Sequence, residues 1–181
     1  MGTPSASVLI DIKAREILSS GIKAGVIPAS FYENFDLNNG TATGSCDLWY
    51  ATTTTAVAAS ATTQYDLAGV LTDSFGTVIT FVEVVLIAVR NKRTTALAYI
   101  TVKPGAATPF GCVAAGKGFW PADIAADNDQ GNVIGPEGWL VLYDKEGVPV
   151  GAGATDRMDV VTSAVVGATN SWDILIVGRS A

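Results

Sequence analysis

The sequence contains no histidine among its 181 residues. Histidine is the commonest general base near neutral pH and the commonest metal-binding side chain, so its absence excludes the Ser-His-Asp and Cys-His routes of hydrolysis. Two carboxylates alone could still cleave a glycosidic bond. The acids available for that role, none of which stands in a recognisable pairing, are Asp66, Asp73, Glu83, Asp123 and Glu137. We therefore expect a protein that is not an enzyme and carries no cofactor.

Charged residues are also scarce, at 15% of the chain against 49% hydrophobic residues. In a typical soluble domain about a quarter of the residues are charged. The shortage favours a surface partly covered by other subunits, with an ordinary Ala- and Thr-rich soluble domain as the alternative. The formal net charge is −6, and the one local group of bases is Arg90-Asn91-Lys92-Arg93. Because binding to a phosphate backbone depends on many bases, we expect no direct contact with nucleic acid.

The two cysteines, Cys46 and Cys112, fit no metal-ligand spacing and are too few for a disulfide framework. We expect free thiols in a reducing cell, with a single disulfide as the alternative. The first residues lack the basic segment and apolar stretch of a secretory signal. The longest apolar run, Phe81 to Val89, contains Glu83 and is too short to span a bilayer. We therefore expect no membrane partner.

Strand patterns dominate the chain after residue 45. The strongest, Thr77 to Asn91, has apolar residues at both parities, which is typical of a strand buried on both faces. Residues 139–150 read as a hairpin, because two apolar stretches flank the turn sequence Asp144-Lys145-Glu146-Gly147. Eight or nine short strands, with turn signals every 8–12 residues or so, predict an all-β chain that folds as a β-sandwich of jelly-roll kind.

A change in composition at Asn38-Asn39-Gly40 divides the chain into two parts. Residues 1–37 form an N-terminal arm or small appended element, and residues 38–181 form the β-sandwich domain. The mixed periodicity of the first part allows a short helix over about residues 8–19 or an extended arm. Its apolar residues cannot close a core alone, so we interpret four of them as candidates for a subunit interface: Leu9, Ile12, Ile17 and Ile22.

Two loop sequences stand out within the β-sandwich part. Phe119 and Trp120 lie in a Gly- and Ala-rich loop, where large aromatics either fill their own core or anchor an interface. Both readings stay open, and the two residues join the interface candidates. Residues 127–131, Asp-Asn-Asp-Gln-Gly, resemble the start of a Ca²⁺ loop. Asn132 and Gly138 occupy positions where an EF-hand needs Gly and Glu, so a polar turn is favoured over a structural cation site.

A series of short motifs, taken in order, resembles small structural proteins of tailed bacteriophages. The motifs are Asn39-Gly40-Thr41, Asp47-Leu48-Trp49-Tyr50, residues 66–76, Ile79-Thr80-Phe81, the strand ending in Asn91, residues 135–138, residues 150–156 and residues 174–180. Each motif is a turn or an apolar strand, and their shared order carries the resemblance. It covers residues 38–180 and is interrupted at Cys112 to Asp127, where this chain has an insertion.

The resemblance implies a head decoration protein, also called a cement protein, which binds the outside of a phage capsid and stabilises it. Its partners would be the major capsid protein and further copies of itself, as a homotrimer. It would be made in the host cytoplasm and located in the virion, on the capsid surface. A tail or fibre-base component is the alternative within the particle. A carbohydrate-binding β-sandwich module is the alternative of a different class.

Overall fold

The structure is a computed structural model of the chain. It describes residues 6–18, 25–73, 75–106, 109–113, 118–121, 131–153, 155–164 and 169–181. All regular secondary structure in these ranges is β-strand, so the predicted all-β class is confirmed. Within the same ranges there is no helix long and apolar enough to cross a membrane.

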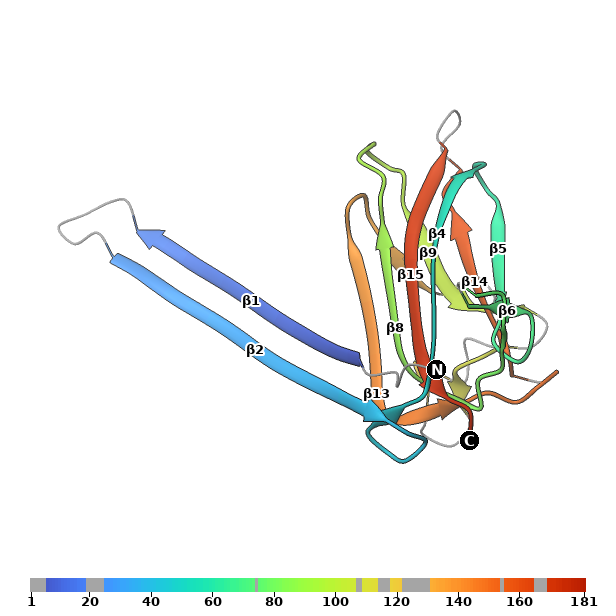
Figure 1. Cartoon of the computed structure of the whole chain (residues 1–181). Helices are drawn as coiled ribbons and strands as arrows, with labels where there is room; N and C mark the ends of the chain where they lie inside the picture. Colours follow the sequence, from blue (N-terminus) through green and yellow to red (C-terminus); the bar gives the residue numbers. More distant parts are fainter. Residues whose placement is uncertain are drawn as a thin grey trace.

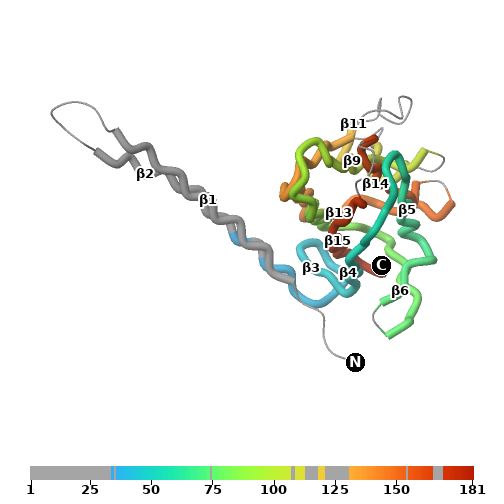
Figure 2. Tube along the Cα trace, turned by 90° about the horizontal axis from the view of Figure 1, so that it is seen from above, coloured from blue at the N-terminus to red at the C-terminus, as the bar shows by residue number. Residues whose placement is uncertain are grey.

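Eight strands form two four-stranded antiparallel sheets that lie face to face (Figure 1, Figure 2). The first sheet has the order β13-β8-β15-β4, and the second sheet has the order β12-β9-β14-β5. The strands of the first sheet are β4 (Leu48–Val57), β8 (Glu83–Asn91), β13 (Trp139–Pro149) and β15 (Asn170–Arg179). Those of the second sheet are β5 (Thr62–Asp66), β9 (Ile100–Pro104), β12 (Asn132–Ile134) and β14 (Arg157–Thr162).

The chain passes from one sheet to the other in a regular way. Strand β4 leads to β5, β8 to β9, β12 to β13, and β14 to β15. Each connection joins two strands that hold the same place in the order of their sheets. Four such wound pairs make an eight-stranded jelly roll. The prediction of a β-sandwich of jelly-roll kind is therefore confirmed.

Side chains of alternate residues fill the space between the sheets. On β15, Trp172, Ile174 and Ile176 are at most 2% exposed and belong to the main core, whereas Asp173 and Leu175 lie on the outer face. This alternation follows from the two-residue period of a strand. It places one row of β15 in the core and leaves the other row for the surface of the molecule.

A polar contact lies within this core. Trp172 donates a hydrogen bond from Nε1 to the hydroxyl of Tyr65 at 2.9 Å. Burial raises the pKa of Tyr65, against hydrogen bonds with Thr54 and Trp172 that lower it. The phenol therefore stays neutral at ordinary pH, and the buried indole N–H has a partner.

Strand β8 has buried residues on both faces, as its apolar residues at both parities predict, although Ala88 is only half-buried and Arg90 is exposed on the outer face. Ile87 and Val89 lie in the core between the sheets. Val85 and Leu86 belong to a second apolar cluster, on the outer face of the first sheet, which Leu37 from the N-terminal segment covers. The strand has apolar residues at both parities because one face packs in the core between the sheets and part of the other face packs against the N-terminal segment.

The hairpin expected over residues 139–150 is wrong. Strand β13 runs beside β8 along its whole length, with a shift of register between Tyr143 and Val148. In that interval Asp144 accepts a hydrogen bond from the backbone N–H of Glu146 at 2.9 Å. The turn residues therefore form a bulge and not a chain reversal. Pairing of both halves with β8 outweighs the local turn signal.

The N-terminal segment is a hairpin of β1 (Ala6–Leu18) and β2 (Gly25–Asn39) (Figure 1). Its antiparallel ladder has no register shift. The short helix considered for residues 8–19 is therefore wrong, and the extended alternative holds. The β-branched residues of β1 favour a strand, and β2 supplies a pairing partner along its entire length. The short remaining strands are β3 (Ser45–Cys46), β6 (Leu71–Thr72), β7 (Val78–Ile79), β10 (Cys112–Val113) and β11 (Trp120–Pro121).

Candidate functional site

The register of the β1–β2 hairpin sorts its residues into two faces. Successive residues of a strand alternate between faces, and directly paired residues share one. One set of positions, which we name the apolar face, is apolar except at Glu16, Glu33 and Gly25. It consists of Ala6, Val8, Ile10, Ile12, Ala14, Glu16 and Leu18 on β1 and Gly25, Ile27, Ala29, Phe31, Glu33, Phe35 and Leu37 on β2. The hairpin is therefore amphipathic by sequence and register.

The four interface candidates of the N-terminal segment divide between these faces. Ile12, paired with Phe31, holds a position on the apolar face. Leu9 and Ile17 hold positions on the opposite face, and Ile22 lies outside the described residues. The structure thus groups Ile12 with residues of β2 that the sequence analysis did not single out.

Both outer edges of the hairpin are open within the described chain. Strand β1 pairs with β2, and β2 pairs further only with β3, through its last two residues. An isolated two-stranded ribbon is at best marginally stable in water. Unpaired N–H and C=O groups along an edge also form a template for another strand. The hairpin therefore has two unpaired edges, within the described residues, to which a further strand could be added.

Leu37 anchors the base of the hairpin to the jelly roll. Its side chain is 2% exposed and packs with Val85, Leu86, Val177 and Cys46. Leu37 also belongs to the apolar face of the hairpin. That face therefore begins in contact with the outer face of the first sheet.

Arg179 fastens the loop that follows β2. Its guanidinium group is 1% exposed and forms an ion pair with Glu83 at 2.6 Å. It donates hydrogen bonds to the carbonyl of Ala42, at 2.9 Å, and to the carbonyl of Glu146. A Cβ atom at Gly147 would collide with this guanidinium group, so glycine there leaves room for it. One buried cation thus joins the hairpin base, the start of β8 and the bulge of β13.

Further hydrogen bonds hold the same loop. The carboxylate of Asp47 accepts the backbone N–H of Ser180 at 2.9 Å and also its hydroxyl. The N–H of Asp47 donates to the carbonyl of Gly178 at 3.2 Å, and the N–H of Gly44 donates to that of Lys145, also at 3.2 Å. These contacts fix the place at which β2 leaves the sandwich.

The outer face of the first sheet presents three rows of side chains, each crossing β13, β8, β15 and β4. The first row is Tyr143, Leu86, Val177 and Trp49; the second is Val141, Ala88, Leu175 and Ala51; the third is Trp139, Arg90, Asp173 and Thr53. Leu37 and Cys46 cover part of the first row. In the second row Val141 is 40% exposed, and in the third row Trp139 is 63% exposed. The second row and Trp139 therefore form an open apolar strip, which is bordered by the polar residues of the third row.

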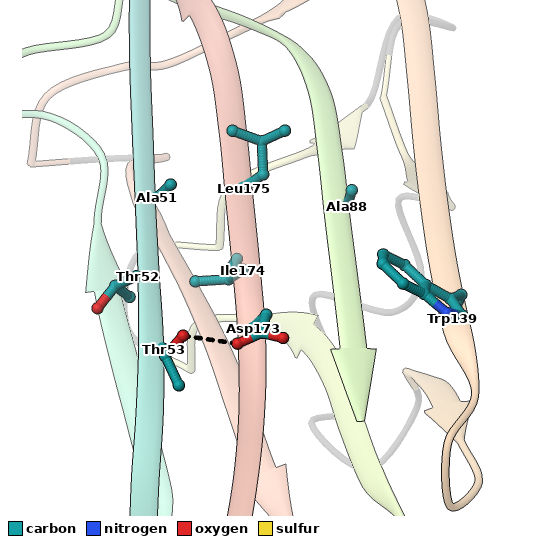
Figure 3. A pocket seen from close by; sticks show the side chains of 8 residues that line it. All are labelled: Ala51, Thr52, Thr53, Ala88, Trp139, Asp173, Ile174 and Leu175. Carbon is teal, nitrogen blue, oxygen red and sulfur yellow. Dashed lines mark hydrogen bonds between the residues drawn. The ribbon is translucent and has the colours of Figure 1, made fainter. Parts of the chain in front are cut away.

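A shallow hollow of about 520 Å³ lies over the second and third rows (Figure 3). Ala51, Ala88 and Leu175 line it, and the ring of Trp139 reaches over from β13 toward β8. Asp173 lies beside these residues in the third row. Small and apolar side chains make this surface suited to an apolar group of a partner.

Charged groups surround the hollow. Asp173 accepts a hydrogen bond from the hydroxyl of Thr53 at 2.6 Å and pairs with Lys92 at 3.3 Å. Burial opposes ionisation of Asp173, but these contacts and the charge of Arg90 outweigh it and lower its pKa. The guanidinium carbon of Arg90 lies 5.4 Å from the ring centroid of Trp139, which is cation–π geometry. The carboxylate is therefore ionised at neutral pH and held by cations.

Trp120 fills the chain's own core. It is 4% exposed and belongs to the main core cluster, and its ring meets the half-buried ring of Phe119 edge-on at 6.1 Å. Phe119 in turn meets Phe110 edge-on at the same distance. Of the two readings left open for these aromatics, the structure shows the own-core one for Trp120.

In the part of the chain that the structure describes, no cluster of three or more Cys, Asp or Glu side chains is placed so that it could hold a metal ion. The acidic loop from Asp127 to Gly131 lies outside the described residues except for Gly131. Of the two cysteines, Cys46 is buried and Cys112 is half-buried.

Comparison of the chain with protein-family models, curated proteins and solved structures finds no match.

Proposed function

We propose that this chain is a structural protein of a bacteriophage particle, which binds the outside of the capsid as a homotrimer and stabilises the shell. The observation that carries the proposal is the amphipathic β1–β2 hairpin, open along both edges and fastened to a jelly roll at its base. The order of motifs along residues 38–180 gives the proposal its setting among phage proteins. The fold agrees with it by analogy, because jelly rolls are common in viral capsid domains and also in lectins.

Physical reasoning links the hairpin to assembly. A ribbon that is marginal alone gains stability when its apolar face is buried, at about 25 cal/mol per Å². Contacts repeated by symmetry add up, so a shell can hold such a protein firmly through many weak contacts. No reactive group is needed for that task.

Binding to a shell tests the proposal. The full chain is mixed with empty shells of the major capsid protein from the same genome, and the mixture is sedimented. We expect the chain to sediment with the shells, to be accessible to added protease there, and to raise the temperature at which the shells break. A chain lacking residues 1–35 keeps Leu37 and Arg179, and it should stay folded by circular dichroism but remain in the supernatant.

Three results would count against the proposal. Absence of binding by the full chain, or recovery in tail fractions of the virion, removes the capsid role. Binding by the shortened chain shows that the hairpin is not the contact. Unfolding of the shortened chain places the hairpin in the domain's own core.

Glycan binding is a second candidate, favoured by the exposed ring of Trp139 and the ionised Asp173, which lie in the same row on either side of Arg90. Aromatic rings and carboxylates are common sugar contacts, although Arg90 already lies over the Trp139 ring. A glycan array with the full chain and a Trp139→Ala variant decides this question. Binding lost in the variant supports the module, whereas a blank array for the full chain removes it.

A further inference from the structure

We infer that the open strip on the first sheet is the docking surface for the hairpin of a second copy of this chain, whose apolar face covers the second and third rows. The inference deepens the proposed function, because it names the contact that would build the oligomer. It concerns self-assembly alone and can be measured without any capsid.

The structure already contains one contact of this kind. Leu37, at the base of the apolar face, packs on Leu86 and Val177 of the first row. Leu175, in the second row, packs against the same cluster and also lines the hollow. The partly covered first row and the open second row therefore form one continuous apolar strip. The apolar face of the hairpin, which already contacts the first row of this strip through Leu37, is chemically suited to cover the second row as well.

Spacing and charge agree with this pairing. Rows of the sheet and same-face positions of the hairpin both repeat every two residues, or roughly 6.6 Å. On the hairpin, Phe31 and Phe35 flank Glu33 on the apolar face. If the position of Phe31 or Phe35 lies over the second row, the position of Glu33, two residues away, lies at the third row, where Arg90 is exposed. The docking would therefore place Glu33, an acidic residue at a position of the apolar face, near the cation of Arg90.

The occupant is a second copy because, within the described residues, a single chain pairs no further strand with the hairpin edges and leaves the strip uncovered. Trp139 and Val141 are 63% and 40% exposed although Leu37 of the same chain covers part of the first row. Each chain offers one hairpin and one strip, so the contact runs head to tail. Such a contact closes into a ring when the rotation between copies permits, and three copies match the proposed homotrimer.

Two matched pairs of variants test the inference by light scattering after size exclusion. Ala51→Arg puts a bulky charge into the hollow on an exposed strand position, and Thr62→Arg puts the same charge on an exposed position of the second sheet. Ile12→Asp with Phe31→Asp disrupts the apolar face, and Lys13→Asp with Ser30→Asp changes the adjacent pair on the opposite face. The full chain should have a mass that is a multiple of 18.6 kDa. The first member of each pair should fall to a single chain, and the second should not.

A mixing experiment distinguishes docking of the hairpin on the strip of another copy from docking on the strip of its own copy. The Ala51→Arg chain keeps an intact hairpin, and the chain with Ile12→Asp and Phe31→Asp keeps an intact strip. Mixed in equal amounts, they should form a dimer of one copy each and grow no further. Two monomers that fail to combine would overturn the inference.

The remaining outcomes are equally decisive. If the full chain is monomeric and Trp139 is shielded from iodide, the hairpin closes on its own sheet and the second copy is not the occupant. If the full chain is monomeric with Trp139 exposed, the strip has no occupant in this protein. If Ala51→Arg assembles like the full chain, the contact lies elsewhere. A correct self-assembly that nevertheless fails to bind shells would disprove the capsid role alone.

Discussion

Replacing Arg179 by methionine should destabilise the protein strongly and loosen the base of the hairpin. The guanidinium group is 1% exposed and pairs with Glu83 at 2.6 Å. It also donates to the carbonyls of Ala42 and Glu146. Methionine fills a similar volume but leaves the carboxylate without its cation and both carbonyls without this donor.

The expected loss follows from these environments. Removing one partner of a buried ion pair costs about 3–5 kcal/mol. Because the side chain of Glu83 is 30% exposed, water can reach the carboxylate that is left behind, and the lower end of the range applies. We expect a loss of about 3 kcal/mol in the free energy of unfolding, which corresponds to a fall of roughly 6–12 °C in Tm for a domain of this size.

Urea unfolding followed by tryptophan fluorescence measures this loss, and amide exchange locates it. The N–H of Gly44, which donates a hydrogen bond to the carbonyl of Lys145, should exchange faster in the variant. The amides in the core of β15 should exchange faster only to the extent that the whole protein is destabilised. Replacing the exposed Arg90 by methionine is the matched control and should cost less than about 1 kcal/mol. A loss below 1 kcal/mol for Arg179→Met, with unchanged exchange at Gly44, would refute the role assigned to the buried cation.

Three further changes test the core, the close approach of two strands and the charged group beside the hollow. Tyr65→Phe removes the acceptor of the buried Trp172 N–H, so it should cost about 1–3 kcal/mol in urea unfolding. Gly178→Ala would drive a Cβ atom into the backbone of β8 and should cost at least about 1–3 kcal/mol, whereas Gly135→Ala meets nothing within 4 Å and should be nearly neutral. Asp173→Asn should cost less than about 1 kcal/mol at pH 7, because the pair is partly exposed. The pKa of Asp173 is lowered in the folded protein. Its contribution to the free energy of unfolding is therefore fully present above the ordinary aspartate pKa of about 3.9 and is lost as the pH falls through the folded pKa. The difference in stability between the wild-type protein and Asp173→Asn should therefore narrow in that acid range.

The jelly roll could be predicted because short segments of the sequence are enough to indicate its strands. Alternating apolar residues and frequent turn signals indicate short strands, and the apolar residues at both parities of β8 indicate a strand inside a sheet. One prediction was wrong and one choice between two structures stayed open, in both cases where a neighbouring strand overrides a local signal. At residues 8–19 a mixed period hid a strand that its pairing with β2 defines, and at residues 144–147 four turn residues became a bulge because both flanks pair with β8.

The candidate surfaces could not be predicted because they arise from register. The open strip combines residues from β13, β8, β15 and β4, which lie far apart in the sequence and meet only when the strands pair. Likewise Phe31 and Ile12 share a face because of one particular register of β1 and β2. Arg179 gave no signal at all: in the sequence it is a lone base near the end of an apolar strand, and its burial depends on a loop more than 130 residues away.

In the proposed assembly, a hairpin that docks on another molecule would transmit any load to the point where it leaves its own sandwich. That point is held by the buried Leu37, by Arg179 and by the bonds between Asp47 and Ser180, which involve the last residues of β15 and the tail after it. Because β15 lies inside the first sheet, between β8 and β4, a force on the hairpin reaches the centre of the jelly roll and not an edge strand. An arm fixed in this way can be pulled by a neighbour without peeling the fold apart.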